Sequence, residues 1–255
     1  ALKPDSPEVA NDLGRLAFRM GMLPQAEVLF RYHISQRPNA PESANNLGCV
    51  LRDQLRYQEA IDVLSAAIQA NPASAMLWNM LGTIMSDMGD CQQAEVFFSE
   101  TLRLAPNHAK ARYNRSNALF NLGHTERAIE DCRQAMAATS NPAELATMGL
   151  ALSSMLLASG DLTQGWDAYD TRLSPEFHDP IHFLVDRPAW TPETDLEGRH
   201  LLLIGEQGLG DEIMFANALD DILEALGPRG RLSLAVSARL APLFQRSYPE
   251  VRVGV

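Results

Sequence analysis

Four stretches of the sequence repeat one pattern at an interval of 34 residues. They read NDLGRLAFRMGMLPQAEVLF (residues 11–30), NNLGCVLRDQLRYQEAIDVL (45–64), NMLGTIMSDMGDCQQAEVFF (79–98) and YNRSNALFNLGHTERAIEDC (113–132). In each stretch the apolar residues recur three or four positions apart on both sides of a polar or glycine-containing centre. This spacing is typical of two amphipathic helices joined by a turn. The sequence therefore predicts a series of helical hairpins.

The same residue types return at fixed places in every unit. The recurring residues are Leu13-Gly14, Leu47-Gly48 and Leu81-Gly82; Ala26, Ala60, Ala94 and Ala128; Phe30, Leu64, Phe98 and Cys132; Pro38, Pro72 and Pro106; and the turn glycines Gly21, Gly89 and Gly123. Small residues let two helices approach, large residues fill the seam, and proline ends the second helix. The pattern resembles the tetratricopeptide repeat (TPR), with Trp78 at its aromatic position.

The TPR resemblance implies hairpins stacked into a right-handed α-superhelix, with the first helix of each hairpin lining a concave groove. We expect four full units over about residues 7–140 and a fifth unit with a shifted register, so that the superhelix covers residues 1–173. In the fifth unit Gly160 takes the turn position, and Trp166 and Tyr169 fall in the second helix. Arg115-Ser116 already replaces Leu-Gly in the fourth unit.

Amide side chains repeat on the predicted groove side. The candidate groove residues are Asn11, Asn45, Asn79 and Tyr113 at one repeat position, with Asn46, Asn114 and Asn117 beside them. An amide both donates and accepts hydrogen bonds, so a row of them can hold the backbone of an extended peptide. The alternative is that these amides cap turns or bond within the hairpins. A chaperone-tail clamp is not expected, because that clamp uses Lys and Arg at these positions.

The charge balance excludes several classes of partner. The chain has 21 Lys and Arg against 32 Asp and Glu, a net charge of -11, which argues against nucleic acid and anionic membranes. The widely spaced Cys49, Cys91 and Cys132 suggest neither a disulfide framework nor a zinc site. No apolar run approaches the roughly 20 residues that span a bilayer, and the first residues lack a signal-peptide pattern. We therefore expect a soluble, cytoplasmic protein without a cofactor.

A different pattern begins after the repeats. Residues 174–198 carry four prolines and no helical period, as a linker does. Pro180 separates His178 from His182, so these two are expected to be loop histidines rather than a metal pair. Residues 199–255 then alternate an apolar run at 199–204, a glycine loop, a helical pattern through 213–226, a strand at 232–236, a short helix at about 238–245 and a strand at 251–255. This order predicts a partial Rossmann-like α/β (βαβαβ) unit.

The glycine loop GEQGLG (205–210) has the spacing GxxGxG rather than GxGxxG. The second strand ends at Ser237 instead of the acidic residue that would bind a ribose. A nicotinamide or flavin dehydrogenase is therefore disfavoured.

Three segments carry a second resemblance: GWDAYDTRL (165–173), RPAW (187–190) and LLLIGEQGLGD (201–211). Their order is similar to that of bacterial TPR proteins fused to a heptosyltransferase-like, glycosyltransferase family 9-like domain of GT-B architecture. The resemblance implies that Asp211 is a general base toward an acceptor hydroxyl, with Glu206, Gln207, Gly208 and Gly210 contacting donor phosphates or acceptor. The alternative for Asp211 is a helix cap, and for both glycines a turn with positive φ.

Two hypotheses of function follow. In the first, a TPR groove binds a protein or peptide within a longer parent protein that transfers sugar from a nucleotide sugar. In the second, the chain is a non-catalytic scaffold with a degenerate transferase-like part. The chain alone is expected to be inactive, because a GT-B cleft needs two Rossmann-like domains.

Overall fold

The computed structural model describes residues 6–177, 185–191, 193–206 and 208–255. The chain divides into two compact units, unit 1 (Ala1–Pro180) and unit 2 (Ile181–Val255). The predicted linker spans this division, and its described residues form no helix or strand. His178 and His182 lie outside the described residues.

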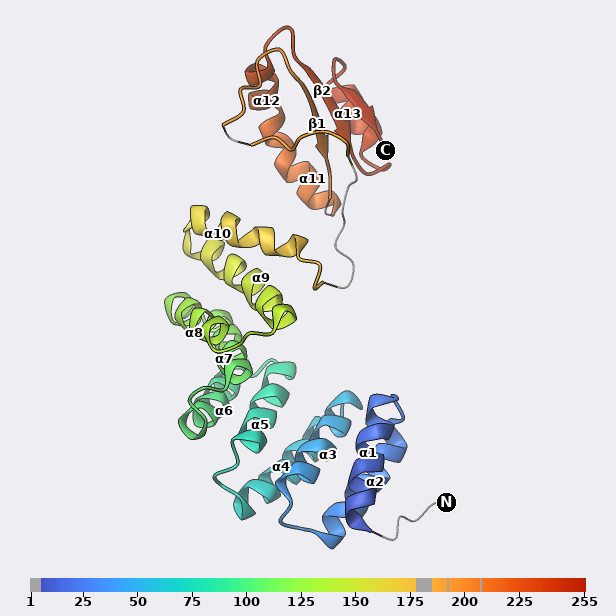
Figure 1. Cartoon of the computed structure of the whole chain (residues 1–255), viewed down its shortest axis with the longest axis vertical. Coiled ribbons are helices and arrows are strands. Elements are labelled where there is room, and N and C mark those ends of the chain that lie inside the picture. Colours follow the sequence, from blue (N-terminus) through green and yellow to red (C-terminus); the bar gives the residue numbers. More distant parts are fainter. Residues whose placement is uncertain (1–5, 178–184, 192, 207) are drawn as a thin grey trace. The chain divides into compact units, whose positions relative to one another are not determined.

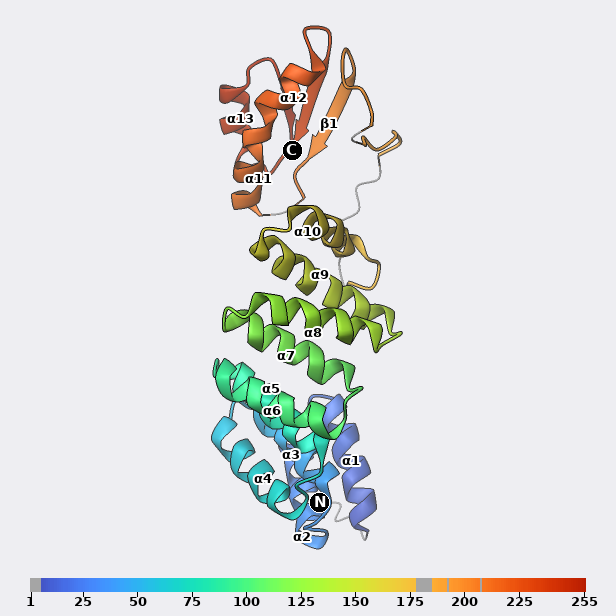
Figure 2. The same ribbon diagram turned by 90° about the vertical axis from the view of Figure 1, so that its left-hand side faces the viewer.

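Unit 1 is a stack of helical hairpins (Figure 1). The five hairpins are α1 (Pro7–Arg19) with α2 (Leu23–Gln36), α3 (Pro41–Asp53) with α4 (Tyr57–Ala70), α5 (Ala75–Asp87) with α6 (Cys91–Leu104), α7 (Ala109–Asn121) with α8 (Thr125–Ala137), and α9 (Pro142–Ser159) with α10 (Leu162–Tyr169), which the 3-10 turn η1 (Asp170–Leu173) extends. The second helix of each hairpin packs on the first helix of the next, as Figure 2 also shows. The expected TPR superhelix is confirmed.

Glycine lets the two helices of a hairpin approach closely. A Cβ built on Gly14 would lie 2.7 Å from the ring of Phe30, and one built on Gly82 would lie 2.6 Å from the ring of Phe98. In hairpin 2 the smaller Leu64 leaves 3.2 Å to a Cβ on Gly48. The Leu-Gly signature therefore reflects helix-to-helix contact inside each hairpin.

The turn between the two helices of a hairpin requires a left-handed residue. Gly21, Gly89 and Gly123 supply it with φ between 71° and 81°. Hairpin 2 has Leu55 there, with φ 59°, and its side chain is 71% exposed. Because a Cβ disfavours this backbone conformation, hairpin 2 contains a strained turn that its neighbours avoid.

The fifth hairpin shows the predicted shift of register. Gly160, with φ 87°, ends the 18-residue α9, which is longer than the first helices of hairpins 1 to 4. Trp166 and Tyr169 lie in α10, as expected. A Cβ on Gly165 would lie 2.7 Å from Leu157, so α10 also packs closely on α9.

The apolar core of unit 1 is divided near its middle. One cluster of buried side chains runs from Ala17 to Ile84, and another runs from Leu119 to Leu156. Between them the described residues form a small cluster of Ala94, Phe98 and Ala118. Leu102 of α6 and Ala111 of α7 are also buried, so this small cluster and these two side chains carry the apolar packing between the two larger clusters.

Unit 2 contains a parallel sheet of three strands in the order β1-β2-β3. The strands are β1 (His200–Ile204), β2 (Arg231–Ala235) and β3 (Arg252–Gly254), and the helices are α11 (Leu209–Phe215), α12 (Leu219–Leu226) and α13 (Ala241–Ser247). Leu201 and Leu203 pack into a cluster with the buried Leu232 and Leu234, whereas Leu202 on the opposite face of β1 is exposed. One face of the sheet thus carries the core.

The expected helical pattern through 213–226 is interrupted in the structure. The 3-10 turn η2 (Ala216–Ala218) separates α11 from α12. Leu219 and Leu226 of α12 are buried, but Ile213 and Met214 of α11 are exposed. The apolar residues of this stretch therefore do not form one continuous buried stripe, and α11 packs against the core through Leu209 at its start.

Candidate functional site

The predicted groove residues lie on the first helices, where they are partly buried. Two of them bond to each other: Asn46 Nδ2 donates to Asn11 Oδ1 at 3.4 Å. Ser43 Oγ donates to the same oxygen at 3.2 Å and also contacts His33 Nδ1. In hairpins 1 and 2 these amides therefore join α1 to α3, which is a bond between hairpins rather than the bond within one hairpin that the alternative expects.

The remaining amides are in a different situation. The side chains of Asn45, Asn114 and Asn117 are partly exposed and make no hydrogen bond to another described residue. Asn79 Oδ1 is buried without a hydrogen-bond partner among the described residues, so it is shielded from an external ligand. Three half-buried amides on α3 and α7 thus remain available to a partner.

Cys49 lies one turn after Asn45 on α3. Burial raises the pKa of its thiol, although the positive charges of Arg52 and Lys110 act to lower it. The thiol therefore stays protonated at neutral pH, and it contributes to this face as a small apolar group.

Hairpin 4 has ions where hairpin 3 has an apolar seam. In hairpin 3 the seam holds Trp78, Leu81 and Phe97, with the two aromatic rings 5.8 Å apart. The residues 34 positions later are Arg112, Arg115 and Asp131, here called the hairpin-4 ion cluster.

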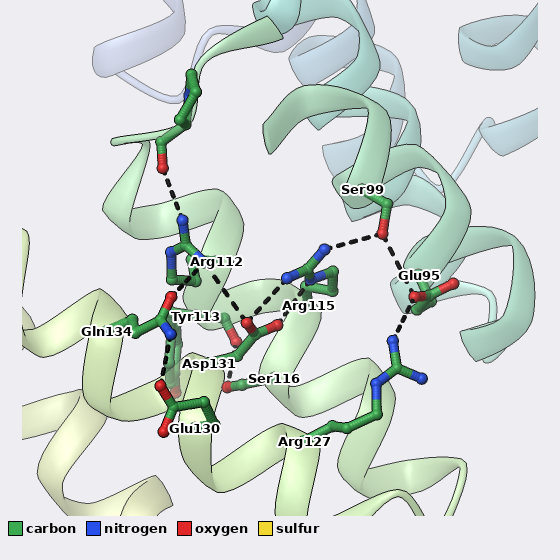
Figure 3. A network of polar contacts seen from close by, with 11 residues as sticks. Glu95, Ser99, Arg112, Tyr113, Arg115, Ser116, Arg127, Glu130, Asp131 and Gln134 are labelled. Atoms are coloured by element: carbon green, nitrogen blue, oxygen red, sulfur yellow. Dashed lines mark hydrogen bonds and ion pairs between the residues drawn. The ribbon is translucent and has the colours of Figure 1, made fainter. Parts of the chain in front are cut away.

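The cluster joins three helices (Figure 3). Arg115 Nε and Nη2 donate to Asp131 Oδ2 and Oδ1 at 2.7 and 2.8 Å. Arg112 Nη1 lies 3.6 Å from Oδ1, and Arg115 Nη1 donates to Ser99 Oγ on α6 at 3.1 Å. The side chain of Asp131 is 8% exposed and that of Arg115 20%. The hydrogen bonds from Arg115 to Asp131 raise the pKa of Arg115 despite its burial.

Arg112 makes a hydrogen bond like one that Trp78 makes at the same repeat position in hairpin 3. Trp78 Nε1 donates to the Pro72 carbonyl at 2.9 Å, and Arg112 Nη2 donates to the Pro106 carbonyl at 2.7 Å. The two prolines are themselves 34 residues apart. In both repeats the loop that precedes the hairpin is therefore hydrogen-bonded to the first helix, by an indole N–H in hairpin 3 and by a guanidinium N–H in hairpin 4.

A hollow of about 370 Å³ opens beside the ion cluster. It is lined by Arg115, Leu119, Glu126, Arg127, Glu130 and Asp131. Arg127 Nη2 lies 3.3 Å from Glu95 Oε1 on α6. The two arginines that line the hollow, Arg115 and Arg127, therefore both have carboxylate partners. The sequence signal for this site is Arg115-Ser116 in place of Leu-Gly, and a second signal is Asp131 at the position that Phe97 holds in hairpin 3.

The candidate loop of unit 2 lies at the carboxyl end of β1. Asp211 is the third residue of α11, and its backbone N–H donates to the Gly208 carbonyl at 3.0 Å. The N-cap of α11 is Gly208, so the structure does not show Asp211 as the cap. Glu206 is described, whereas Gln207 lies outside the described residues.

The expected positive φ at Gly208 and Gly210 is wrong. Gly208 has φ -70° in extended backbone, and Gly210 belongs to α11 and is not among the positive-φ glycines. The helix begins one residue before Gly210, so right-handed helical backbone replaces the expected turn. A Cβ on Gly210 would meet no atom within 4 Å.

Glu212, in the first turn of α11, is a residue that no sequence motif singles out. Its Oε2 accepts a hydrogen bond from the Ser237 backbone N–H at 3.0 Å, just beyond the end of β2. The Gly205 N–H donates to the Ala235 carbonyl at 2.8 Å. These two bonds hold the loop after β1 beside the end of β2. A Cβ on Gly205 would lie 2.9 Å from Glu212 Cδ, which explains the glycine there.

The described residues offer neither a metal site nor a membrane span. No group of three or more His, Cys, Asp or Glu residues is placed to hold a metal ion in the part of the chain that the structure describes. Within the same residues, no helix combines the length and apolar character needed to cross a membrane.

Known proteins similar to this chain include one long relative. Protein FlbA of Caulobacter vibrioides is 51% identical over 253 residues, which are 99% of this chain and 42% of FlbA. The chain therefore spans about two fifths of the length of that relative.

Two solved structures share the fold of unit 1. MamA of Desulfovibrio magneticus has a TM-score of 0.56 and 19% identity, over 66% of this chain and 93% of that one. YrrB, described as a TPR protein with an unusual peptide-binding site, has a TM-score of 0.51 and 18% identity, over 64% and 83% of the two chains.

The tetratricopeptide repeat family model matches residues 11–75, 45–85 and 79–142. These residues make up more than half of the chain, and they coincide with the hairpins built on Leu-Gly and the turn glycines. The chain belongs to the tetratricopeptide repeat family.

Proposed function

We propose that the first-helix face of unit 1 binds an extended segment of a partner protein. The observation that carries this proposal is the set of half-buried amides without a described hydrogen-bond partner, Asn45, Asn114 and Asn117. Such groups gain hydrogen bonds from a peptide backbone at little further cost of desolvation. The unusual peptide-binding site of YrrB adds support from a protein of the same fold.

The preferred segment is uncharged or mildly basic. The chain carries a net charge of -11, which repels acidic peptides. The amide row supplies no cluster of Lys or Arg, so it lacks the groups that hold carboxylates. The backbone of the peptide rather than its side chains would then provide most of the contacts.

A binding experiment tests this proposal. Linear 12-residue peptides selected from a phage library against the full chain would be labelled and measured by fluorescence anisotropy. Replacing Asn45, Asn114 and Asn117 together by Ala should raise the Kd about ten- to hundred-fold, the loss of a few net hydrogen bonds. The thermal unfolding temperature should change little. Replacing Asn107 and Asn217, two exposed amides outside the first helices, should leave the Kd unchanged. Equal effects of the two sets, or none, would refute the proposal.

A second candidate function concerns the longer protein to which this chain is similar. We propose three parts, a TPR superhelix over 1–173, a linker over 174–198 and a partial Rossmann-like unit over 199–255 that belongs to a glycosyltransferase-like domain. The observation that favours it is Glu212 in the first turn of α11, which accepts a hydrogen bond from the Ser237 N–H just beyond the end of β2. Open parallel α/β sheets bind ligands at this edge. The three free cysteines fit a reducing, cytoplasmic setting.

In this second candidate Asp211 accepts the proton of an acceptor hydroxyl, while Glu206 and Gln207 orient the substrate and Gly208 and Gly210 admit it closely. The donor is a nucleotide sugar. The chain alone should give no turnover, because its described residues contain one three-stranded sheet and a GT-B cleft is formed between two domains. The alternative is a scaffold in which the transferase-like part no longer reacts.

The test uses a full-length relative with a panel of nucleotide sugars. Transfer or hydrolysis that is lost in Asp211→Asn and kept in Asp220→Asn, an exposed acidic residue on α12, would support the enzyme. No turnover of any donor would favour the scaffold. Turnover that survives Asp211→Asn would overturn the assigned role of Asp211.

A further inference from the structure

The hollow of about 370 Å³ beside the hairpin-4 ion cluster lies within the stack of unit 1. Hairpin 3 packs on one side of hairpin 4 and hairpin 5 packs on the other, so the hollow does not belong to an outer end of the stack. Arg115, Arg127, Glu130 and Asp131 are labelled in Figure 3. The walls come from α7 through Arg115 and Leu119, and from α8 through Glu126, Arg127, Glu130 and Asp131.

The repeat explains why the seam of hairpin 4 is less filled than that of hairpin 3. Asp131 stands at the position that Phe97 holds in hairpin 3, where the Phe97 ring packs 5.8 Å from the ring of Trp78. A carboxylate is smaller than a phenyl ring, and two hydrogen bonds from Arg115 hold the carboxylate of Asp131. Hairpin 4 therefore lacks the ring that fills the seam of hairpin 3, and its wall carries charge instead.

The two arginines of the hollow are neutralised inside the stack. Arg115 Nε lies 2.7 Å from Asp131 Oδ2, and Arg127 Nη2 lies 3.3 Å from Glu95 Oε1. Their positive charges are therefore balanced before any partner binds. Guanidinium groups that already have carboxylate partners offer little attraction to an anionic ligand.

Two carboxylates on α8 are not balanced in this way. Glu126 and Glu130 are exposed, and neither forms an ion pair with another described residue. Glu130 accepts a hydrogen bond from the neutral amide of Gln134, which leaves its charge in place. Residues four positions apart on a helix lie on one face, so these two carboxylates are neighbours at the hollow. Together with the net charge of -11, they favour a cationic partner.

We propose that this hollow receives the side chain of an arginine or a lysine from a partner protein. Leu119 supplies an apolar wall, against which the aliphatic stem of such a side chain packs. The cationic end of the side chain pairs with Glu126 and Glu130. The volume and the apolar wall suit a long side chain better than a bare metal ion. This site involves the second helix of hairpin 4, whereas the amides of the proposed peptide site lie on first helices, so the two sites are distinct.

Nuclear magnetic resonance of the full chain, with labelled leucine methyl groups and backbone amides, tests the proposal. The probe is N-acetyl-arginine methylamide, and its control is N-acetyl-citrulline methylamide, which has nearly the same shape without the charge. The arginine probe should shift the Leu119 methyl signals and the amide signals of α8, with a Kd of about 1–10 mM for a single side chain. N-acetyl-lysine methylamide should act at the same signals. The citrulline probe should bind about five-fold or more weakly, because it forms no ion pair.

Two pairs of substitutions identify the groups that bind the probe. Glu126→Gln with Glu130→Gln removes both charges from exposed positions and should raise the Kd of the arginine probe about five-fold or more. Asp220→Asn with Glu224→Gln removes an equally spaced, exposed pair on α12 and should leave that Kd unchanged. Circular dichroism checks that each variant is folded.

Several results would overturn the proposal. One is the absence of any shift at about 50 mM arginine probe, since a Kd in the expected range gives nearly full occupancy there. Others are equal binding of the citrulline probe, binding that survives removal of both glutamates, and shifts confined to residues outside α7 and α8.

Discussion

Removing the carboxylate of the hairpin-4 ion cluster should destabilise unit 1 strongly. In Asp131→Ala, Arg115 loses two short hydrogen bonds and Arg112 loses its nearby negative charge. Both guanidinium groups stay charged, because arginine is not neutralised in proteins. The variant thus leaves two positive charges close together in a largely buried seam.

The expected cost follows from the burial of the partners. Breaking a fully buried ion pair costs about 3–5 kcal/mol. Arg115 is 20% exposed and keeps its hydrogen bond to Ser99, so part of its solvation is recovered. We therefore expect a loss of about 2–3 kcal/mol in the free energy of unfolding of unit 1, below the range for complete burial.

Replacing the whole cluster should have a different effect. The triple variant Arg112→Trp, Arg115→Leu and Asp131→Phe installs the seam residues of hairpin 3 and keeps an N–H donor for the Pro106 carbonyl. Apolar replacement of a buried ion pair is often neutral or stabilising. The free energy of unfolding of this variant should therefore lie within about 1 kcal/mol of that of the original chain, or above it.

Urea unfolding followed by circular dichroism at the helix band measures both variants, since most of the helices belong to unit 1. Hydrogen exchange of the α7 and α8 amides locates the effect, because repeat stacks can unfold locally. A cost of less than about 1 kcal/mol for Asp131→Ala, the value of an exposed ion pair, would contradict the expected penalty of a buried charge. A triple variant as unstable as Asp131→Ala would show that the seam depends on shape rather than on charge.

Two further predictions concern the turn of hairpin 2 and the ion pairs of α2. Leu55→Gly should stabilise the chain by about 1 kcal/mol, because glycine adopts left-handed backbone without strain, whereas Leu55→Ala should not stabilise it. The urea midpoints of the two variants measure this difference. An equal gain in both variants would attribute the gain to removal of the exposed leucine side chain instead. Burial raises the pKa of Glu27, but hydrogen bonds from Arg56 and Arg31 outweigh it and hold that pKa below its ordinary value. A carboxyl with a lowered folded pKa stabilises the fold above its unfolded pKa, and this stability is lost as pH falls through the folded value. As pH falls below about 4.5, the ordinary value for Glu, the original chain should therefore lose more stability than Glu27→Gln, and parallel pH profiles would contradict the role of these bonds.

The sequence predicted the hairpins because their packing depends on residues of one hairpin. Gly82 faces Phe98 only sixteen positions later, and the turn glycines act on their own backbone. Such short-range requirements repeat at every unit and are visible as a period. The break between α11 and α12 was not predictable in this way, because it depends on which apolar residues reach the core of unit 2.

The candidate site was less predictable than the fold. Arg115 and Asp131 are sixteen positions apart within one hairpin, like Gly82 and Phe98, so the repeat does bring them together; the period alone does not show that these two departures form an ion pair. Glu212 resembles any acidic residue in the first turn of a helix, and its bond to the Ser237 N–H crosses from one strand end to the next. Pairings of this kind are set by tertiary structure, which a repeat period does not encode.

The asparagine position shows why chemistry cannot be transferred from one repeat to the next. Asn11, Asn45 and Asn79 share one place in the 34-residue period. Asn11 joins α1 to α3, Asn79 has a buried and unbonded oxygen, and Asn45 has a side chain without a described partner. The difference arises from the neighbours: hairpin 2 supplies Ser43 and Asn46 to the first amide, whereas the equivalent positions in hairpin 3 are Leu77 and Met80. An amide bonded to the next hairpin contributes to stacking, and an amide without such a partner is free to bind a ligand. Although both residues belong to one asparagine row, the binding of a peptide should therefore depend on Asn45 far more than on Asn11.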